Sequence, residues 1–329
     1  MISEKSRILQ LNFTRIHRHL KRRNFLSLAA SFVPLSAATN ESSIPIIDTH
    51  IHLFDPRRPQ GVPWPPKENP ILYKPALPAR YASIAEPLGI VGAIEIEASP
   101  WLEDNQWVLD IAARSPIIVG TVGDLEPGKP EFRKQFERFH KNPLFRGIRY
   151  GHLWGRDLGA RLSAPAFVAD LKILADAGLV LDTANPTPAL IRDVLRLTDR
   201  VPTLRIIIDH LPHLQPLPSD ANELSKRPQI YVKVSEVLQR VNGRVVFDPN
   251  YYRPVLDHFW DLFGEDRLLY GSDWPNSDPW GTYAQVLGVV RPYFLSKGRA
   301  AAEKFFCRNS VAAYGWIKRT EKQPQGGAH

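Results

Sequence analysis

The feature that most constrains the fold is a series of eight short apolar runs, each separated from the next by room for a helix. The runs span residues 44–52, 91–99, 117–125, 145–150, 179–184, 205–211, 229–236 and 267–275. Apolar residues at helical spacing lie between them, over residues 104–114, 131–140, 164–178, 188–200, 251–264 and 282–293. Strands that alternate with helices predict a parallel sheet, because parallel neighbours need a crossover connection.

Two arrangements fit eight such units, an open doubly wound sheet and a closed (β/α)8 TIM barrel. Polar residues cluster at the C-terminal end of nearly every run, where a barrel collects its active site. We therefore predict an α/β protein in which residues 44–315 form a single TIM-barrel domain. Residues 55–78 are rich in proline and contain Trp64, which indicates an extended loop insertion after the first strand.

The positive charge of the chain lies mostly at its start. The formal net charge is +8, from 42 Lys and Arg against 34 Asp and Glu. Residues 1–38 contain seven basic residues and one acid, so the remaining 35 basic and 33 acidic residues leave only +2. A nearly neutral body predicts a small-molecule substrate and no nucleic-acid partner. The single cysteine, Cys307, excludes a disulfide framework.

Residues 1–38 have the pattern of an export signal. Lys21-Arg22-Arg23 precedes a short apolar stretch and small residues at positions 36–38, as in a cleavable secretory signal. The paired arginines resemble a twin-arginine signal; the alternative is a basic amphipathic helix of a cytosolic protein. No later segment reaches the roughly 18 apolar residues of a membrane span. We expect a periplasmic or otherwise exported protein without a membrane segment in its mature form, and a polar C-terminal tail over residues 316–329.

Two histidines and an aspartate are the main candidates for the active site. The first run reads Ile46-Ile47-Asp48-Thr49-His50-Ile51-His52, and strict alternation would place Asp48, His50 and His52 on the interior face. Two imidazoles at this spacing can hold one metal ion or bind one substrate oxygen. Barrel closure should bring Asp273 beside them, where a carboxylate can ligate a metal, orient a water or accept its proton. The alternative for Asp273 is a turn cap.

Other candidates follow the middle runs. His210 ends the sixth run and is a candidate general acid or carbonyl polariser, whereas strict alternation would turn Asp209 away from the lumen. Arg146 and Arg149 in the fourth run could hold a substrate carboxylate or an array of hydroxyls, or they could form structural ion pairs.

Three further residues are candidates for substrate binding. Glu97 and Lys233 could face each other across the lumen as an ion pair, or they could join the site. Trp274 follows the last run, and its flat ring could pack against either a sugar or an aromatic acid.

Taken together, these motifs resemble one known family. The resemblance is to the amidohydrolase-related (family 2) branch of the amidohydrolase superfamily, and within it to the L-fuconolactonase and dicarboxylate-lactonase group. It is carried by Ile47-Asp48-Thr49-His50-Ile51-His52, Phe145-Arg146-Gly147-Ile148-Arg149, Asp209-His210-Leu211 and Gly271-Ser272-Asp273-Trp274-Pro275, and it covers about residues 44–315 in order. It implies a (β/α)8 barrel and a hydrolase that opens a sugar lactone or a carboxylated lactone by water attack.

The resemblance also implies roles for individual residues. Asp273 would activate the water, and His50, His52 and His210 would polarise the lactone carbonyl. Arg146 or Arg149 would orient the substrate.

The resemblance bears on metal binding as well. Related metal-dependent decarboxylases bind zinc with the first-strand histidines, a fifth-strand histidine and the last-strand aspartate. The fifth run here, over residues 179–184, contains no histidine. We therefore expect that no cofactor is required, although His50, His52 and Asp273 could hold a single divalent ion such as Zn²⁺. A metal-dependent decarboxylase or amide hydrolase is the alternative, and an exported binding protein with a degenerate site is a second one.

The signal predicts cleavage near Ala38. N-terminal sequencing of the protein from a periplasmic fraction should find a chain that starts close to Thr39. A full-length chain found only in the cytosol would contradict this prediction.

Overall fold

The computed structural model describes residues 43–213 and 219–325, and one strand lies within or overlaps each predicted apolar run. The strands are β1 (Ile46–Ile51), β2 (Ile90–Ile96), β3 (Ile118–Gly123), β4 (Phe145–Arg149), β5 (Val180–Thr183), β6 (Ile206–Ile208), β7 (Ile230–Val234) and β10 (Leu268–Tyr270). The predicted export signal over residues 1–38 lies outside the described residues, so export stays a prediction.

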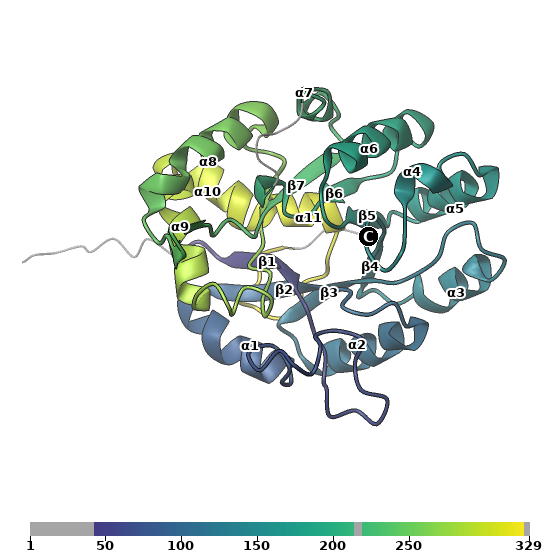
Figure 1. Cartoon of the computed structure of the whole chain (residues 1–329), viewed down its shortest axis with the longest axis horizontal. Coiled ribbons are helices and arrows are strands. Elements are labelled where there is room, and N and C mark those ends of the chain that lie inside the picture. The colour runs from purple at the N-terminus through teal and green to yellow at the C-terminus, as the bar shows by residue number, and fades with distance from the viewer. Residues whose placement is uncertain (1–42, 214–218, 326–329) are drawn as a thin grey trace, which may run out of the picture. The chain divides into compact units, whose positions relative to one another are not determined.

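The eight strands close into a barrel that the helices surround (Figure 1). Hydrogen-bonded neighbours follow the order β1-β2-β3-β4-β5-β6-β7-β10, and every pair is parallel. The circle closes where Asp273 N donates to His50 O at 2.9 Å and His52 N donates to Trp274 O at 2.8 Å. The (β/α)8 TIM barrel is therefore confirmed, and the open doubly wound sheet is excluded, because it would leave two unpaired edges.

Six of the described α-helices overlap the helical ranges that the sequence predicts. The described α-helices are α1 (Pro78–Ala85), α2 (Leu102–Arg114), α3 (Phe132–Phe139), α4 (Leu158–Arg161), α5 (Pro165–Asp176), α6 (Pro188–Arg200), α7 (Ala221–Ser225), α8 (Pro249–Phe263), α9 (Tyr283–Ser296), α10 (Arg299–Glu303) and α11 (Asn309–Tyr314). The six predicted helices are α2, α3, α5, α6, α8 and α9. The others have eight residues or fewer, too few turns to show a clear period.

Capping residues define where several helices begin. Thr187 accepts a hydrogen bond from Leu190 N at the start of α6, and Thr282 and Gln285 form a capping box at the start of α9. Both arrangements satisfy backbone N–H groups that the first turn leaves without a partner. These caps fix where each loop at the C-terminal end of the barrel becomes a helix.

The core has two layers, one outside the strands and one inside the lumen. Aliphatic residues of the strands, including Ile47, Ile94, Val119 and Leu269, fill the lower lumen and pack against Tyr314. The other faces of the strands pack against the surrounding helices in a larger cluster. Each layer is apolar and buried, so polar groups inside the lumen stand out as functional candidates.

Residues 316–325 pack against the N-terminal end of the barrel, opposite the candidate site. Trp316 is fully buried. Arg319 Nη1 donates to Ile118 O at 2.8 Å, and Gln323 Nε2 donates to Val91 O at 2.9 Å. These side chains satisfy carbonyl groups around the starts of β2 and β3. Residues 316–325 therefore cover the N-terminal end of the barrel and provide hydrogen-bond donors to its carbonyl groups.

Two irregular segments lie at the C-terminal end of the barrel. After β1, Phe54 pairs with Ala76 in a single antiparallel bridge, and the chain between them forms an extended loop. After β7, a short hairpin joins β8 (Arg240–Val241) and β9 (Arg244–Val245). Among the described helices, we find none with the length and apolar character that crossing a membrane requires.

Candidate active site

Two strand ends and one turn bring the predicted catalytic residues together. His50 Nε2, His52 Nε2 and Asp273 Oδ1 form a triangle with separations of 3.3, 3.4 and 3.2 Å. His210 follows β6, and its Nε2 lies 3.9 Å from Asp273 Oδ1. All four residues are buried. The structure therefore unites the four predicted catalytic residues.

The first strand does not alternate regularly, and this corrects one prediction. The pairing of β1 with β2 shifts between Asp48 and Ile51. As a result, Asp48 leaves the interior face on which His50 lies. Its carboxylate instead accepts hydrogen bonds from Tyr81 of α1 and Tyr283 of α9, at 2.9 and 2.8 Å.

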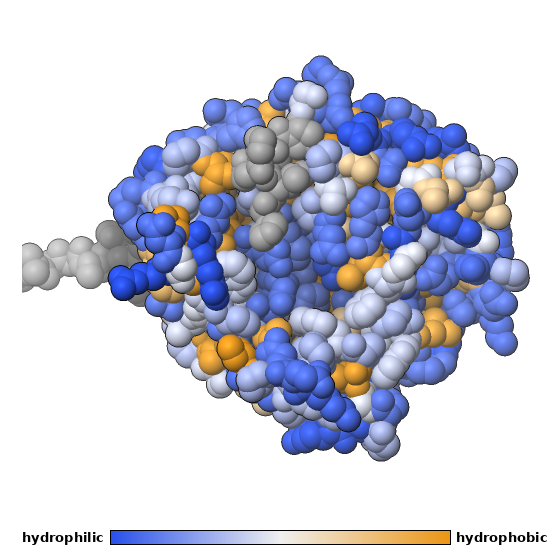
Figure 2. All heavy atoms as spheres, in the orientation of Figure 1, coloured by the Kyte–Doolittle hydropathy of each residue, from blue (hydrophilic) through white to orange (hydrophobic). Residues whose placement is uncertain are grey.

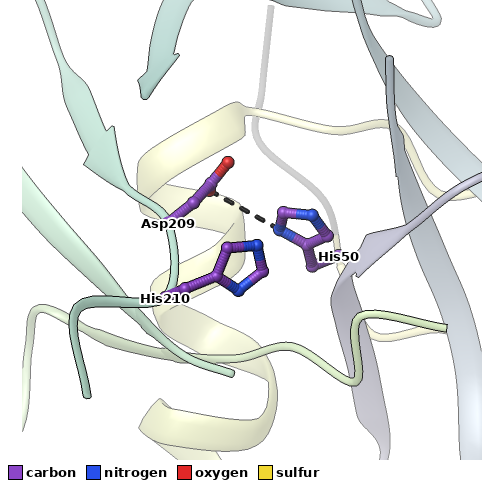
Figure 3. Close-up of side chains that lie close together, drawn as sticks. All are labelled: His50, Asp209 and His210. Carbon is purple, nitrogen blue, oxygen red and sulfur yellow. Dashed lines mark ion pairs between the residues drawn. The ribbon is translucent and has the colours of Figure 1, made fainter. Parts of the chain in front are cut away.

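Asp209 lies inside the lumen, which corrects the opposite prediction. Its Oδ1 is 3.5 Å from His50 Nδ1, and its Oδ2 accepts from Arg149 Nε at 3.1 Å. Figure 3 shows Asp209 and His210 on one side, facing His50 on β1. His210 has a positive φ of 53°, and this turn brings two consecutive side chains to the site. Strict alternation cannot describe such a turn.

A cavity of about 180 Å³ opens beside this cluster. Figure 2 shows hydrophilic residues around a hollow in the middle of the face that it presents. The cavity is lined by His52, Trp64, Glu97, Ala98, Arg149, Leu153, Trp154, Asn185, His210, Glu236, Asp273 and Asn276. His50 is fully buried and lies behind His52 and Asp273. It therefore supports them from one layer deeper and does not line the cavity as the sequence prediction required.

Two predicted substrate-binding residues line the cavity and three do not. Glu97 lies on the wall and accepts a hydrogen bond from Trp154 Nε1 at 3.0 Å, and Arg149 lies beside it. Arg146 donates to Tyr314 O at 2.8 Å, near the closed end of the barrel. Trp274 is fully buried against Tyr81.

Lys233 is also buried away from the cavity. Its Nζ lies 2.6 Å from Asp182 Oδ2 and 2.8 Å from Asp209 Oδ1. The predicted ion pair between Glu97 and Lys233 is therefore not the one that forms. The physical reason is depth, because Lys233 lies below the histidines whereas Glu97 reaches the cavity wall.

The sequence reasoning missed two residues that contact Asp273. Asn276 Nδ2 donates to Asp273 Oδ2 at 2.7 Å and to Glu236 Oε1 at 3.1 Å. Asn276 follows Asp273 by three residues in the same turn, a spacing that could have identified it. Glu236 follows β7 and has a positive φ of 49°. Such strain in a non-glycine residue is a common mark of a functional site.

Burial sets the protonation of the site at neutral pH. Desolvation raises the pKa of Asp273 to about 7 and that of Glu97 to about 8. Desolvation also lowers the pKa of His52 to about 3 and holds those of His50 and His210 well below the usual range. The three histidines are therefore neutral, and Asp273 can exchange a proton near pH 7.

The triangle of His50, His52 and Asp273 has the dimensions of a metal site. A tetrahedral zinc ion with bonds of roughly 2.0–2.1 Å keeps its ligand atoms about 3.3–3.4 Å apart. The three separations measured here are within 0.2 Å of that range. Neutral imidazoles and a carboxylate are also the right ligand types. The spacing and the ligand types of the three residues therefore match those of a single divalent ion.

Comparison with known proteins agrees with the fold and shows the family. Residues 47–316 match the amidohydrolase family. The chain belongs to this family. It is a hydrolase, and it is 27% identical over 245 residues to L-fucono-1,5-lactonase from Burkholderia ambifaria, which covers 70% of this chain and 80% of that relative.

Solved structures share the fold of this amidohydrolase at lower identity. An amidohydrolase from Burkholderia multivorans with bound zinc has a TM-score of 0.72 and 20% identity, covering 83% of this chain and 99% of that one. The 5-carboxyvanillate decarboxylase from Sphingomonas paucimobilis has a TM-score of 0.61 and 12% identity, with coverage of 83% and 99%. The superfamily usually binds a divalent metal. This finding, with the fit of the triangle, conflicts with the expectation that no cofactor is required.

The raised pKa of Asp273 predicts a pH-dependent gain in stability for D273N. The folded state holds this proton more tightly than the unfolded state, so the wild type loses stability as pH rises from about 4 to 7. Asparagine does not titrate, so the free energy of unfolding of D273N should rise relative to that of the wild type between about pH 4 and 7. Above about pH 7 the difference should stay constant. Chemical unfolding of both proteins at pH 4, 6 and 8 measures the difference. A difference independent of pH would contradict the prediction.

Proposed function

We propose that this amidohydrolase opens a lactone by attack of a water molecule that Asp273 deprotonates. The observation that carries the proposal is a carboxylate at the cavity with a pKa raised to about 7. A general base is most effective when its pKa lies near the working pH. The B. ambifaria relative is named as a lactonase, which supports a cyclic ester as the substrate class.

The chemical step can be followed through the residues of the site. Asp273 accepts one proton from water as the oxygen attacks the lactone carbonyl, and negative charge develops on the carbonyl oxygen. When the ring C–O bond breaks, Asp273 returns the proton to the departing alkoxide. The products are a carboxyl group and a free hydroxyl, so atoms and charge balance.

His210 and Arg149 are placed to stabilise the developing oxyanion. Both line the cavity. His210 Nδ1 lies 2.8 Å from Ser235 Oγ, whose hydroxyl can donate to Nδ1 and leave the ring proton on Nε2, the atom nearer to Asp273. Donors that are already oriented toward the oxyanion are often the largest contribution to such catalysis.

The charges of the cavity favour a neutral, hydroxyl-rich lactone over a carboxylated one. Three acidic residues, Glu97, Glu236 and Asp273, lie on the wall. Among the described lining residues Arg149 is the one cation, and Asp209 already pairs with it at 3.1 Å. These carboxyl groups can form hydrogen bonds with sugar hydroxyls. An anionic substrate would be repelled by those that are ionised, whereas Glu97, with its pKa raised to about 8, is mostly protonated at neutral pH.

Aromatic residues and amides on the wall support the same substrate. Trp64 and Trp154 provide flat apolar surfaces for a sugar ring. Asn185 and Asn276 add groups that can both donate to and accept from hydroxyls. The sugar lactone is therefore the substrate class that we propose.

We also propose that a divalent ion is not required for hydrolysis. On β5 the lumen contains Asp182, whose Oδ2 is occupied by Lys233 and Tyr314 at 2.6 and 2.8 Å. The strand thus presents no imidazole as an additional ligand. If a divalent ion binds, His50, His52 and Asp273 would hold it, and it would polarise a carbonyl or acidify a water.

The substitution D273N tests the base directly. It preserves the size of the side chain but removes the basic oxygen, so kcat for a neutral sugar lactone should fall about 10²–10⁴-fold with little change in KM. The wild type should lose activity as pH falls through about 7, because the protonated carboxyl cannot accept a proton. Steady-state kinetics on neutral and dicarboxylated lactones provide both measurements.

Two outcomes would overturn this mechanism. One is a folded D273N with near-normal kcat. The other is a wild type that binds lactones but turns over none of them, which would favour the degenerate binding protein.

Chelation tests the metal proposal. Activity should persist after exhaustive dialysis against EDTA, with less than one equivalent of bound zinc by elemental analysis, because the chain's own donors suffice. If the chelator abolishes turnover and zinc restores it, the metal-dependent decarboxylase or amide hydrolase becomes the better assignment, and aromatic acids and amides should then be tested.

A further inference from the structure

Lys233 lies beneath His50 and takes no part in the chemical step described above. Its Nζ is surrounded by Asp182 Oδ2 at 2.6 Å, Asp209 Oδ1 at 2.8 Å and His50 Nδ1 at 3.3 Å. The side chain is fully buried. An ammonium group has three donors and no acceptor. Asp182 Oδ2 accepts one of its hydrogen bonds and Asp209 Oδ1 is an ion-pair contact. The contact with His50 can form only if Nδ1 offers a lone pair.

Asp209 competes with Lys233 for the same ring nitrogen. A proton on His50 Nδ1 could point to Asp209 Oδ1, but that distance is 3.5 Å (Figure 3), and Oδ1 already lies against the ammonium. A proton on Nδ1 would also face the ammonium as donor against donor. Because Nδ1 accepts from the ammonium, the proton of the ring lies on Nε2.

The hydrogen bonds of His52 also place the His50 proton on Nε2. His52 Nδ1 lies 2.8 Å from Ile96 O, and a carbonyl oxygen only accepts, so Nδ1 carries the proton of His52. Its Nε2 is then a lone pair, 3.3 Å from His50 Nε2. A donor on His50 meets an acceptor on His52. The hydrogen bonds thus run in one direction, from Lys233 through His50 and His52 to Ile96.

We propose that Lys233 is a positioning residue that fixes His50 as the tautomer protonated on Nε2 and thereby opposes a divalent ion at His50, His52 and Asp273. An ion needs a lone pair on both Nε2 atoms. His50 can provide one only by moving its proton to Nδ1, against the ammonium. For catalysis the inference rests on the proposed function: the His50 N–H donates to His52 Nε2, which lies 3.2 Å from Asp273 Oδ1, so the His50 tautomer orients His52 beside the base.

The test uses the full-length protein, two variants and a control. K233M removes the ammonium. The double variant K233M/D182N also removes one buried acid, so that the charges of Arg149 and Asp209 balance each other. The double variant serves if K233M alone does not fold. Y314F is the matched control, because Tyr314 donates to Asp182 Oδ2 in the same network and is not a hydrogen-bond partner of His50. Each protein is labelled with ¹⁵N-histidine, and His50 is assigned by its loss in H50Q.

Three measurements separate the possible results. In the wild type and in Y314F, NMR should find His50 protonated on Nε2; in the Lys233 variants the proton should move to Nδ1. Calorimetric titration with Zn²⁺ should show binding tighter by a factor on the order of 10–100 in those variants only, the range over which neighbours of metal ligands change affinity. In zinc-free buffer, kcat for the lactone should fall about tenfold, as expected when the one hydrogen bond that orients His52 beside the base is lost.

A wild-type His50 protonated on Nδ1 would overturn the inference. So would an unchanged zinc affinity in whichever Lys233 variant folds. A wild type that hydrolyses no lactone would refute the proposed function, whereas the tautomer and zinc measurements would still decide the role of Lys233.

Discussion

The position of Asp273, the proposed base, depends on one buried carboxylate, that of Asp48, at the junction where the barrel closes. Asp48 Oδ1 accepts from His50 N at 3.1 Å and from Ser272 N at 2.9 Å, and Oδ2 accepts from Ser272 Oγ at 2.6 Å. These bonds join His50 on β1 to Ser272, the residue that precedes Asp273. Asp273 itself has a positive φ of 57°, which the surrounding hydrogen bonds must maintain. The separations between the site atoms are therefore consequences of this junction.

A second constraint is the charge that the lumen contains. Arg149, Asp182, Asp209 and Lys233 are all buried, two cations against two anions. Burying such groups carries a desolvation penalty that their mutual attraction only partly offsets, so ion pairs of this kind are weak arguments for stability. Their effect here is on the position of a proton. The lower lumen is aliphatic, and the charged layer lies between it and the histidines, where Lys233 fixes which nitrogen of His50 carries the proton.

The sequence predicted the strands because lumen-facing and helix-facing residues are both apolar, so each strand appears as a continuous run. It failed where the backbone departs from strict alternation. Asp48 and Asp209 were each assigned to the wrong side because of a register shift in β1 and a left-handed residue after β6. Arg146 and Lys233 were misplaced for another reason, since depth along the barrel axis is not encoded in the period of a strand.

His50 Nε2, His52 Nε2 and Asp273 Oδ1 could be held close together by a cation or by shared protons. Assigning each proton to an atom distinguishes the two cases. His52 Nε2, a lone pair, lies 3.2 Å from Asp273 Oδ1, and two acceptors so close require either a metal or a shared proton. The pKa of Asp273, raised to about 7, supplies that proton in the resting site, and the His50 N–H supplies a second donor. Loss of the Asp273 proton leaves a carboxylate at the cavity, the state that the proposed mechanism requires. In that mechanism, a scaffold that usually holds a metal works through hydrogen bonds, because an ammonium lies behind one of the residues that could bind the ion.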